Sequence, residues 1–331
     1  MNNFTYRQVN MVEDALNEKT GNTAFIAGGT NLLDLMKENI AKPGRLIDIN
    51  HIHRLDEVVE LEDGSIRLGA TVTNADTAWH PVVESKLPLV SKAILSGASP
   101  QLRNMATNGG NLMQRTRCYY FYDKATPCNK REPGSGCSAL YGYSRIHAIL
   151  GGSDHCIATH PSDFCVALAA LDAVVEVKGK YGEREIEFAA FHRLPEETPE
   201  IDNTLEPDEL ITGIRIPGNS FTKHYSYLKI RDRTSFAFAL VSVATAFEMD
   251  GKTIMKARIA LGGVAHKPWR NKGAEAFLEG KTATAENFEK AAEAILDDAK
   301  GTKFNAFKIP LAKKAIIRNA FQAIKMIRGH E

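Results

Sequence analysis

The placement of the cysteines constrains this chain more than any other feature of its sequence. Four of its five cysteines stand in one central segment, at Cys118, Cys128, Cys137 and Cys156. The segment has no clear helical or strand periodicity, and its prolines and glycines predict turns that can bring distant thiols together. Four thiolates are what an iron–sulfur cluster requires. Because no two of these cysteines form a C-x-x-C pair, the spacing alone does not choose iron over zinc.

The fifth thiol differs from the other four. Cys165 falls in an apolar helical pattern with Val166, Leu168 and Ala169, where cysteine behaves as a small buried hydrophobe. We therefore do not expect it to be a metal ligand. An odd number of cysteines in a chain of 331 residues also fits poorly with a disulfide framework.

Charge and hydropathy exclude two classes of partner. The 41 Lys and Arg residues nearly balance the 40 Asp and Glu residues, so no field is strong enough to indicate nucleic acid or a membrane surface. No apolar run approaches the roughly 18 residues of a membrane helix. The N-terminus shows no export signal, which makes the cytoplasm the default location; export while bound to a signal-bearing partner is the alternative.

The hydrophobic pattern predicts an α+β fold. The first fifty residues indicate two β–α units, with helices at Val12–Glu18 and Asn31–Glu38 and strands at Ala24–Ile26 and Arg45–Ile49. Further strands and helices are expected up to residue 188, interrupted by the cysteine-rich segment, which we interpret as an insert over about 114–158. They are the strands Ser65–Gly69, Ala173–Lys178 and Glu185–Phe188 and the helices Val90–Leu95 and Pro161–Leu171.

A Pro-rich, acidic segment at Leu194–Pro207 marks a connection between two domains, predicted at 1–218 and 219–331. In the second domain, strands followed by helices predict a three-stranded sheet covered by helices. The expected strands are Lys223–Ile230, Ala237–Glu248 and Thr253–Leu261, and the expected helices are Ala274–Leu278, Ala285–Asp297 and Leu311–Ile327.

Two glycine pairs stand at strand-to-helix or turn positions. The first is Ala27-Gly28-Gly29-Thr30-Asn31, with Thr30 as the expected N-cap of the next helix. The second is Arg103-Asn104-Met105-Ala106-Thr107-Asn108-Gly109-Gly110-Asn111. Glycines let a backbone approach a phosphate closely, so two such turns indicate a diphosphate between them, although an ordinary tight turn is the alternative for either pair. Neither matches the G-x-G-x-x-G dinucleotide fingerprint.

Four segments carry a resemblance to a known family: both glycine motifs, Thr159-His160-Pro161-Ser162-Asp163 and Lys229-Ile230-Arg231. The resemblance to this family covers nearly the whole length of the sequence. This is the family of FAD-binding subunits and domains of xanthine dehydrogenase, aldehyde oxidoreductase and carbon monoxide dehydrogenase-type molybdenum enzymes. The resemblance implies a two-lobed FAD-binding domain of the PCMH, or vanillyl-alcohol-oxidase, type followed by the α+β C-terminal domain. Capping of the following helix is the alternative role for Asp163.

The resemblance also implies which residues bind cofactors. FAD contacts are expected at Ile26, Ala27, Gly28, Gly29, Thr30, Asn31, Leu32, Leu33, Thr107, Gly110, Asn111, His160, Asp163, Ile211 and Lys229. A subset of these subunits, such as that of the periplasmic aldehyde oxidoreductase of bacteria, has a similar cysteine-rich insert that binds a 4Fe-4S cluster. The cluster ligands implied here are Cys118, Cys128, Cys137 and Cys156. Arg115, Arg117, Lys130 and Arg131 are expected around the cluster as charge compensation, as a docking rim or as a solvated loop.

As a member of this family, the chain is expected to be an electron-transferring oxidoreductase subunit without a catalytic residue of its own. A molybdopterin-containing large subunit would oxidise the substrate, and a 2Fe-2S small subunit would deliver electrons to the FAD. NAD, oxygen, a quinone or a ferredoxin would each suit the reduced flavin as acceptor. Two alternatives stay open: a self-contained FAD-dependent oxidase or reductase, and a zinc-stabilised interaction module in which the glycine turns bind nothing.

Overall fold

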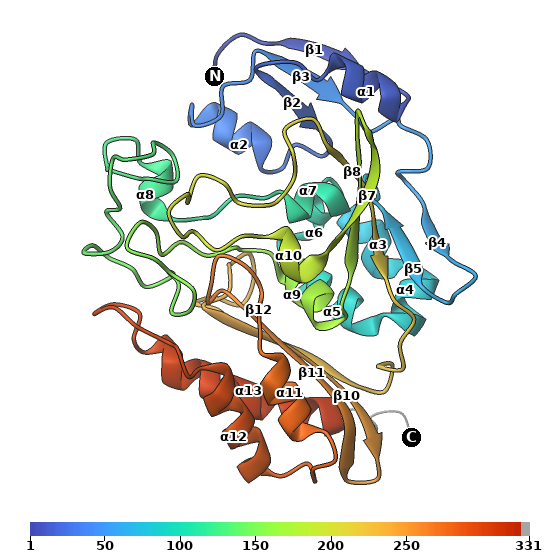
Figure 1. Ribbon diagram of the computed structural model, residues 1–331, viewed down its shortest axis with the longest axis vertical. Helices are drawn as coiled ribbons and strands as arrows, with labels where there is room; N and C mark the ends of the chain where they lie inside the picture. The colour runs from blue at the N-terminus through green and yellow to red at the C-terminus, as the bar shows by residue number, and fades with distance from the viewer. Residues whose placement is uncertain (326–331) are drawn as a thin grey trace.

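The computed structural model describes residues 1–325, which form three sheets with helices packed between and around them (Figure 1). The first sheet is parallel, with the strand order β1 (Thr5–Gln8), β3 (Arg45–Asp48), β2 (Thr23–Ile26). The connecting helices are α1 (Val12–Glu18) and α2 (Leu32–Lys37). Both predicted β–α units are thus confirmed. The sequence did not predict β1, because all four of its residues are exposed and carry no burial periodicity.

The second sheet is antiparallel and has five strands in the order β4-β5-β8-β6-β7. Its strands are β4 (Val58–Glu60), β5 (Ile66–Gly69), β8 (Leu210–Ile216), β6 (Val174–Gly179) and β7 (Gly182–Glu187). The helices of this lobe are α3 (Asn74–Trp79), α4 (Pro81–Lys86), α5 (Pro88–Ser96), α6 (Pro100–Arg103), α7 (Asn108–Leu112), α9 (Asp163–Ala170) and α10 (Phe188–Phe191). The central strand β8 follows the Pro-rich segment in the chain, yet it pairs with β5 and β6, which precede that segment. The order of the strands in the sequence therefore does not predict their order in the sheet.

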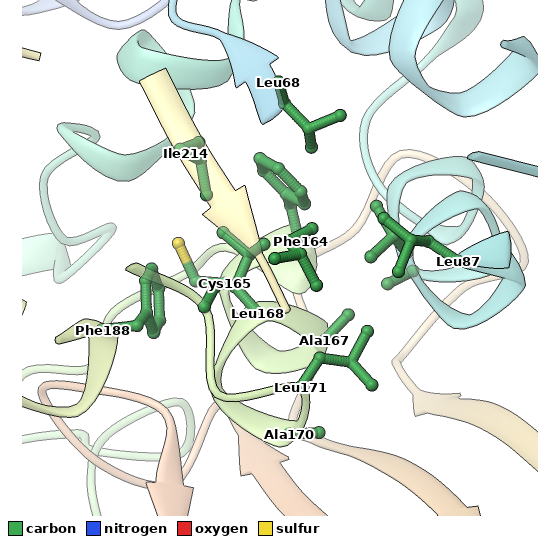
Figure 2. Close-up of a cluster of buried hydrophobic side chains, with 14 of the residues drawn as sticks. Leu68, Leu87, Phe164, Cys165, Ala167, Leu168, Ala170, Leu171, Phe188 and Ile214 are labelled. Carbon is green, nitrogen blue, oxygen red and sulfur yellow. The ribbon is translucent and has the colours of Figure 1, made fainter. Parts of the chain in front are cut away.

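The helix α9 holds the two domains together. Seven of its eight residues are buried, which is typical of a helix enclosed on all sides. Figure 2 shows its side chains, Cys165 included, packed among Leu68, Leu87, Phe188 and Ile214. The prediction that Cys165 is a buried hydrophobe is confirmed, since none of its surface is exposed. Its burial raises the pKa of the thiol to about 12.

The third sheet belongs to the C-terminal part of the chain, with the order β12-β11-β10-β9. The strands are β9 (His224–Ile230), β10 (Val241–Asp250), β11 (Thr253–Gly262) and β12 (Trp269–Arg270), and the helices are α11 (Lys272–Leu278), α12 (Ala285–Ile295) and α13 (Lys308–Lys325). The predicted three-stranded sheet is therefore wrong by one strand: β12 is only two residues long, too short to give a periodic signal. Residues 326 and 327 of the predicted last helix lie outside the described residues.

Helices cover both faces of this sheet. α13 packs on β9 and β10, whereas α5 and α9 contact the sheet from the side of the N-terminal domain. Seven successive residues of β10, from Val241 to Phe247, are consequently buried, as in a strand covered on both faces. The predicted boundary at residues 218 and 219 lies in the loop between β8 and β9 and stays a prediction. No helix within residues 1–325 is both long and apolar enough to cross a membrane.

The cysteine-rich segment is a set of loops with one short helix, α8 (Tyr119–Tyr122), drawn in green beside the first lobe in Figure 1. Isolated β-bridges pair Cys128 with Cys137 and Ser153 with Cys156. Cys118, Cys128 and Cys156 share a small core with Phe121 and with Leu35 of α2. The insert therefore packs against the first lobe, which is the part of the chain formed by the β1-β3-β2 sheet with α1 and α2, and does not project into solvent.

Candidate cofactor sites

A cavity of about 520 Å³ lies between the first lobe and the second sheet, bounded by the β2–α2 turn, α7 and the start of β8. Ten of the predicted FAD-binding residues line it: Ile26, Ala27, Gly28, Gly29, Thr30, Asn31, Leu32, Thr107, Gly110 and Ile211. Leu33, Asn111, His160, Asp163 and Lys229 do not line this cavity. Residues that sequence reasoning missed also line it, among them Lys19, Phe25, Leu35, Met113, Arg115, Leu205, Glu206 and Glu209. No motif marks these residues, because they come from separate elements.

The first glycine pair is required by the fold of the cavity wall. A Cβ atom at Gly28 would lie 1.7 Å from the carbonyl oxygen of Met105, so only glycine fits there. Gly29 has a φ of +69°, the left-handed region that favours glycine. Since Met105 belongs to the second glycine motif, the two motifs abut one another. The arrangement leaves a narrow cradle of backbone at the cavity wall, which suits a phosphate.

Asn31, two residues after the glycine pair, has a polar side-chain group without a partner among the described residues. The predicted N-cap Thr30 is wrong, because α2 begins at Leu32 and Asn31 stands at its cap without a side-chain capping bond. Asn31 Oδ1 instead accepts a hydrogen bond of 2.8 Å from the backbone N–H of Arg115. The buried Nδ2 of Asn31 has no partner among the described residues. A buried amide donor in the wall of a cavity indicates that a ligand oxygen completes the site.

The second glycine motif connects the cavity with α9. Thr107 Oγ1 accepts a 3.3 Å hydrogen bond from Gly110 N at the start of α7. Asn111 points away from the cavity: its amide donates to Asn74 at 2.6 Å, and its Oδ1 accepts from Ser162 Oγ at 2.5 Å. Ser162 is the N-cap of α9 and accepts a hydrogen bond from Cys165 N. Capping of α9 is therefore the role of Ser162, and the capping alternative for Asp163 is wrong.

A buried polar cluster follows directly at the start of α9. Lys229 Nζ lies 2.6 Å from Asp163 Oδ2, and Tyr227 donates to Asp163 Oδ1 at 2.7 Å. Lys229 also donates to the carbonyl of Ser96 at 3.1 Å. Burial and the neighbouring Asp163 carboxylate hold the pKa of Tyr227 well above its usual range. Asp163 and Lys229, predicted from segments far apart in sequence, thus meet at one place, and Ser162, directly before Asp163, binds Asn111.

His160 lies in a buried group of imidazoles. Its ring centroid is 4.2 Å from that of His192, and its Nε2 has no partner among the described residues. Burial holds the pKa of His160 well below its usual range and lowers that of His192 to about 4, so both rings are neutral at pH 7. The FAD contact of His160 stays a prediction, as do those of all the other predicted FAD-binding residues, inside the cavity or outside it.

The four clustered cysteines line one small cavity of about 10 Å³, together with Thr116, Tyr120, Phe121, Pro127, Asn129, Lys130, Ser138, Ala139 and Ala158. All are free thiols, and all but Cys137 are buried. Burial raises the pKa of Cys118 to about 12, whereas a hydrogen bond with Cys156 lowers that of Cys137 to about 6. A second group of possible metal ligands lies elsewhere among residues 1–325: ligand atoms of the buried His160, Cys165 and His192 are within 4.8 Å of one another.

The basic residues around this pocket are held by contacts within the chain. Lys130 is 2% exposed and pairs with Asp202 at 2.5 Å, and Arg115 pairs with the same carboxylate at 2.7 Å. Arg117 donates to the hydroxyl of Tyr122, and Arg131 donates to the carbonyls of Tyr120, Phe121 and Thr126. For Lys130, the interpretation as a solvated or docking residue is wrong. Its ammonium instead places a buried positive charge beside the cysteine pocket.

Comparison with known proteins agrees with this geometry. Residues 2–219 match the family described as the FAD-binding domain in molybdopterin dehydrogenase, and residues 224–316 match the carbon monoxide dehydrogenase flavoprotein C-terminal domain. The fold and its first site thus define an FAD-binding flavoprotein. The chain belongs to the FAD-binding medium subunits of the molybdenum hydroxylase family, of the aldehyde oxidoreductase and xanthine dehydrogenase type.

Two relatives illustrate the range of similarity. The chain is 49% identical over 319 residues to the aldehyde oxidoreductase FAD-binding subunit PaoB of Escherichia coli K12, with 96% of each chain covered. It is 27% identical over 296 residues to the carbon monoxide dehydrogenase medium chain of Hydrogenophaga pseudoflava, covering 88% of this chain and 86% of the relative. A solved structure of carbon monoxide dehydrogenase from that organism aligns with a TM-score of 0.75 at 25% identity, over 97% of this chain and 98% of that one.

Proposed function

We propose that this subunit holds FAD along the cavity and towards the Asp163–Lys229 pair, and a 4Fe-4S cluster at Cys118, Cys128, Cys137 and Cys156. When bound, FAD exchanges electrons singly or in pairs, and an iron–sulfur cluster carries one at a time. The chain's own residues position the two groups. In this proposal the subunit is a relay, and the organic substrate is oxidised on another subunit.

One observation carries the proposal: the two sites share a wall. Leu35 of α2 lines the FAD cavity and also packs in the core formed by Cys118, Cys128 and Cys156. Arg115 likewise lines the cavity and pairs with Asp202, which also binds Lys130 beside the cysteines. Two redox groups that both border Leu35 would be close neighbours.

The FAD would lie along the cavity and extend beyond it. The cavity wall runs from the glycine pair and the unpaired amide of Asn31 to Thr107 and Gly110 at the start of α7. From there, hydrogen bonds of Asn111 and Ser162 connect α7 with the start of α9, where Asp163 lies. A dinucleotide is long enough to require such an extended site. This extension would include three of the five predicted residues outside the cavity: Asn111, Asp163 and Lys229.

The donor set and the local charge support a cluster as the occupant of the cysteine pocket. Four thiol side chains line this one pocket, and four thiolates are what an iron–sulfur cluster requires. A zinc ion would use the same four thiolates, so the metal count described below distinguishes the two. The buried Lys130 ammonium would offset part of the negative charge of such a cluster.

The partners proposed are a molybdopterin-containing large subunit and a 2Fe-2S small subunit. The family membership supports this assembly over a self-contained oxidase, because relatives are named as medium chains or FAD-binding subunits. The proposed location is the cytoplasm, with export in the company of a signal-bearing subunit as the second possibility. Co-expression with the proposed large and small subunits followed by gel filtration tests the assembly, and fractionation of the cells tests the location.

A metal and flavin count tests the cofactor proposal. The subunit is purified anaerobically, and FAD, iron, acid-labile sulfide and zinc are measured on one sample, with an EPR spectrum after dithionite reduction. We expect about one FAD with about four iron and four sulfide per chain. FAD without iron would contradict the cluster alone. Stoichiometric zinc at the four cysteines would replace the cluster by a structural site.

A further inference from the structure

A row of exposed aromatic rings lies next to the cysteine pocket. Tyr119 stacks on Tyr143 with ring centroids 6.2 Å apart, and Tyr143 contacts Phe304 at 5.4 Å. The exposed fractions of these three side chains are 47%, 50% and 37%. Phe307, three residues after Phe304, is 37% exposed as well. Clustered apolar rings that are exposed to water are typical of an interaction site, because soluble monomeric proteins rarely expose large contiguous apolar patches.

This row is connected to one of the proposed cluster ligands. His147 Nε2 lies 3.1 Å from Cys118 Sγ, and the His147 ring contacts the Tyr119 ring with centroids 6.3 Å apart. Tyr119 is also the residue directly after Cys118. A protein seated on the exposed rings would therefore lie close to Cys118 of the cysteine pocket.

Cations lie over these rings. The Arg145 guanidinium is 4.7 Å from the Phe307 ring, and Lys303 Nζ is 5.5 Å from the Phe304 ring. Arg145 is paired with Asp232 at 2.7 Å, so its charge is partly balanced, whereas Lys303 is exposed and adds a positive charge. Arg233, next to Asp232, is a further exposed cation. The charge around the rings is therefore positive, which favours an acidic partner.

We propose that this aromatic face, formed by Tyr119, Tyr143, Phe304, Phe307, Arg145 and Lys303, is the docking site of an acidic one-electron carrier protein. The inference rests on the proposed cluster, since the face adjoins its cysteines. Tyrosine, phenylalanine and arginine are enriched in the cores of protein interfaces, and the cations steer an acidic partner. In the exchange one electron passes between the carrier and the proposed cluster of the subunit, so that one is oxidised as the other is reduced. No bond forms or breaks, and no proton moves.

Binding of a plant-type 2Fe-2S ferredoxin, an acidic one-electron carrier, tests the proposal on the purified multisubunit enzyme. Titration calorimetry gives the Kd at low and at high salt, and stopped-flow mixing with reduced ferredoxin gives the electron-transfer rate. The variants are Tyr143→Ala and Lys303→Glu. Matched controls are Tyr181→Ala, fully exposed in the β6–β7 turn, and Lys281→Glu, which lies over Phe277 beside the β10–β11 hairpin.

We expect each face variant to weaken ferredoxin binding about tenfold or more, with little change in either control. Binding should also weaken with salt, and basic cytochrome c should not compete. Equal Kd values for face variants and controls, with about four iron per chain in the separately purified subunit, would overturn the docking site but leave the cluster intact. Loss of a subunit from the face variants on gel filtration would assign the face to the assembly instead. Absence of iron from the separately purified native subunit would refute the cluster, and the docking proposal with it.

Discussion

Asp163 and Lys229 form a buried ion pair of 2.6 Å that joins α9 of the FAD-binding region to β9 of the C-terminal sheet. Their side chains are 7% and 4% exposed. Tyr227, two residues before Lys229, donates to the other carboxylate oxygen. The pair therefore connects the two regions of the chain at the end of the proposed FAD site.

Replacing Lys229 by Met should destabilise the fold by about 3–5 kcal/mol, because it leaves the buried Asp163 carboxylate without its cation. Scanning calorimetry of the FAD-loaded subunit measures the change, and released flavin measures cofactor loss. Lys290→Met is the matched control. It removes a fully exposed pair with Glu286, which solvent screens, and should leave the stability nearly unchanged. Similar shifts for the two variants would contradict a structural role for the buried pair.

Gly28→Ala should abolish stable FAD binding. The new methyl group would have to displace the Met105 carbonyl, and this moves the two glycine motifs apart. We expect FAD affinity to fall at least about tenfold, or about 1.4 kcal/mol, in a chain whose circular dichroism still shows a folded protein. Gly44→Ala, where the nearest atom to the new methyl is 3.8 Å away, should keep its flavin. Normal FAD content in the Gly28 variant would place the cofactor elsewhere.

Acid should destabilise the protein through His192. Burial lowers its pKa to about 4, below the value near 6.5 of an unfolded histidine, so the unfolded chain takes up a proton that the folded chain does not. The stability is intact above pH 6.5 and falls as the pH drops from about 6.5 towards about 4, by at most about 3 kcal/mol.

His192→Gln keeps a donor for the Leu112 carbonyl, which His192 Nε2 contacts at 2.9 Å, but cannot be protonated in this range. Unfolding midpoints at pH 7.5 and pH 4.5 should therefore lie closer together in this variant than in the native chain. The exposed His51→Gln serves as the control and should retain the native difference. An unchanged difference in the His192 variant would show that other groups cause the acid sensitivity.

Iron content should distinguish the clustered cysteines from the fifth. Cys128→Ser should lower the iron bound per chain to a small fraction of the native value, because an oxygen replaces one of four thiolate ligands. Cys165→Ala should retain native iron and reduce stability only by about 1–2 kcal/mol, since it leaves a small cavity in the core shown in Figure 2. Iron analysis and thermal unfolding on both variants provide the test. Loss of iron from the Cys165 variant would place that thiol among the ligands.

Local sequence signals predicted much of the fold. The helix Val12–Glu18 has the bounds found in the structure, and the long strands of the C-terminal sheet lie within a few residues of their predicted positions. Such elements are long or strongly periodic, so each carries its own signal. Short elements gave none: β12 is two residues long, and β1 is exposed along its whole length. Thr30 also looked like an N-cap, but Asn31 takes that position.

The glycine pairs and the four clustered cysteines were readable from the sequence alone, because backbone freedom and thiol chemistry are properties of the residues themselves. Only the tertiary structure brought Met105 against Gly28, Lys229 against Asp163 and Leu35 between the cavity and the cysteines. These contacts join segments that are far apart in the chain. They depend on how whole elements pack, and the pattern of any one segment does not contain that information.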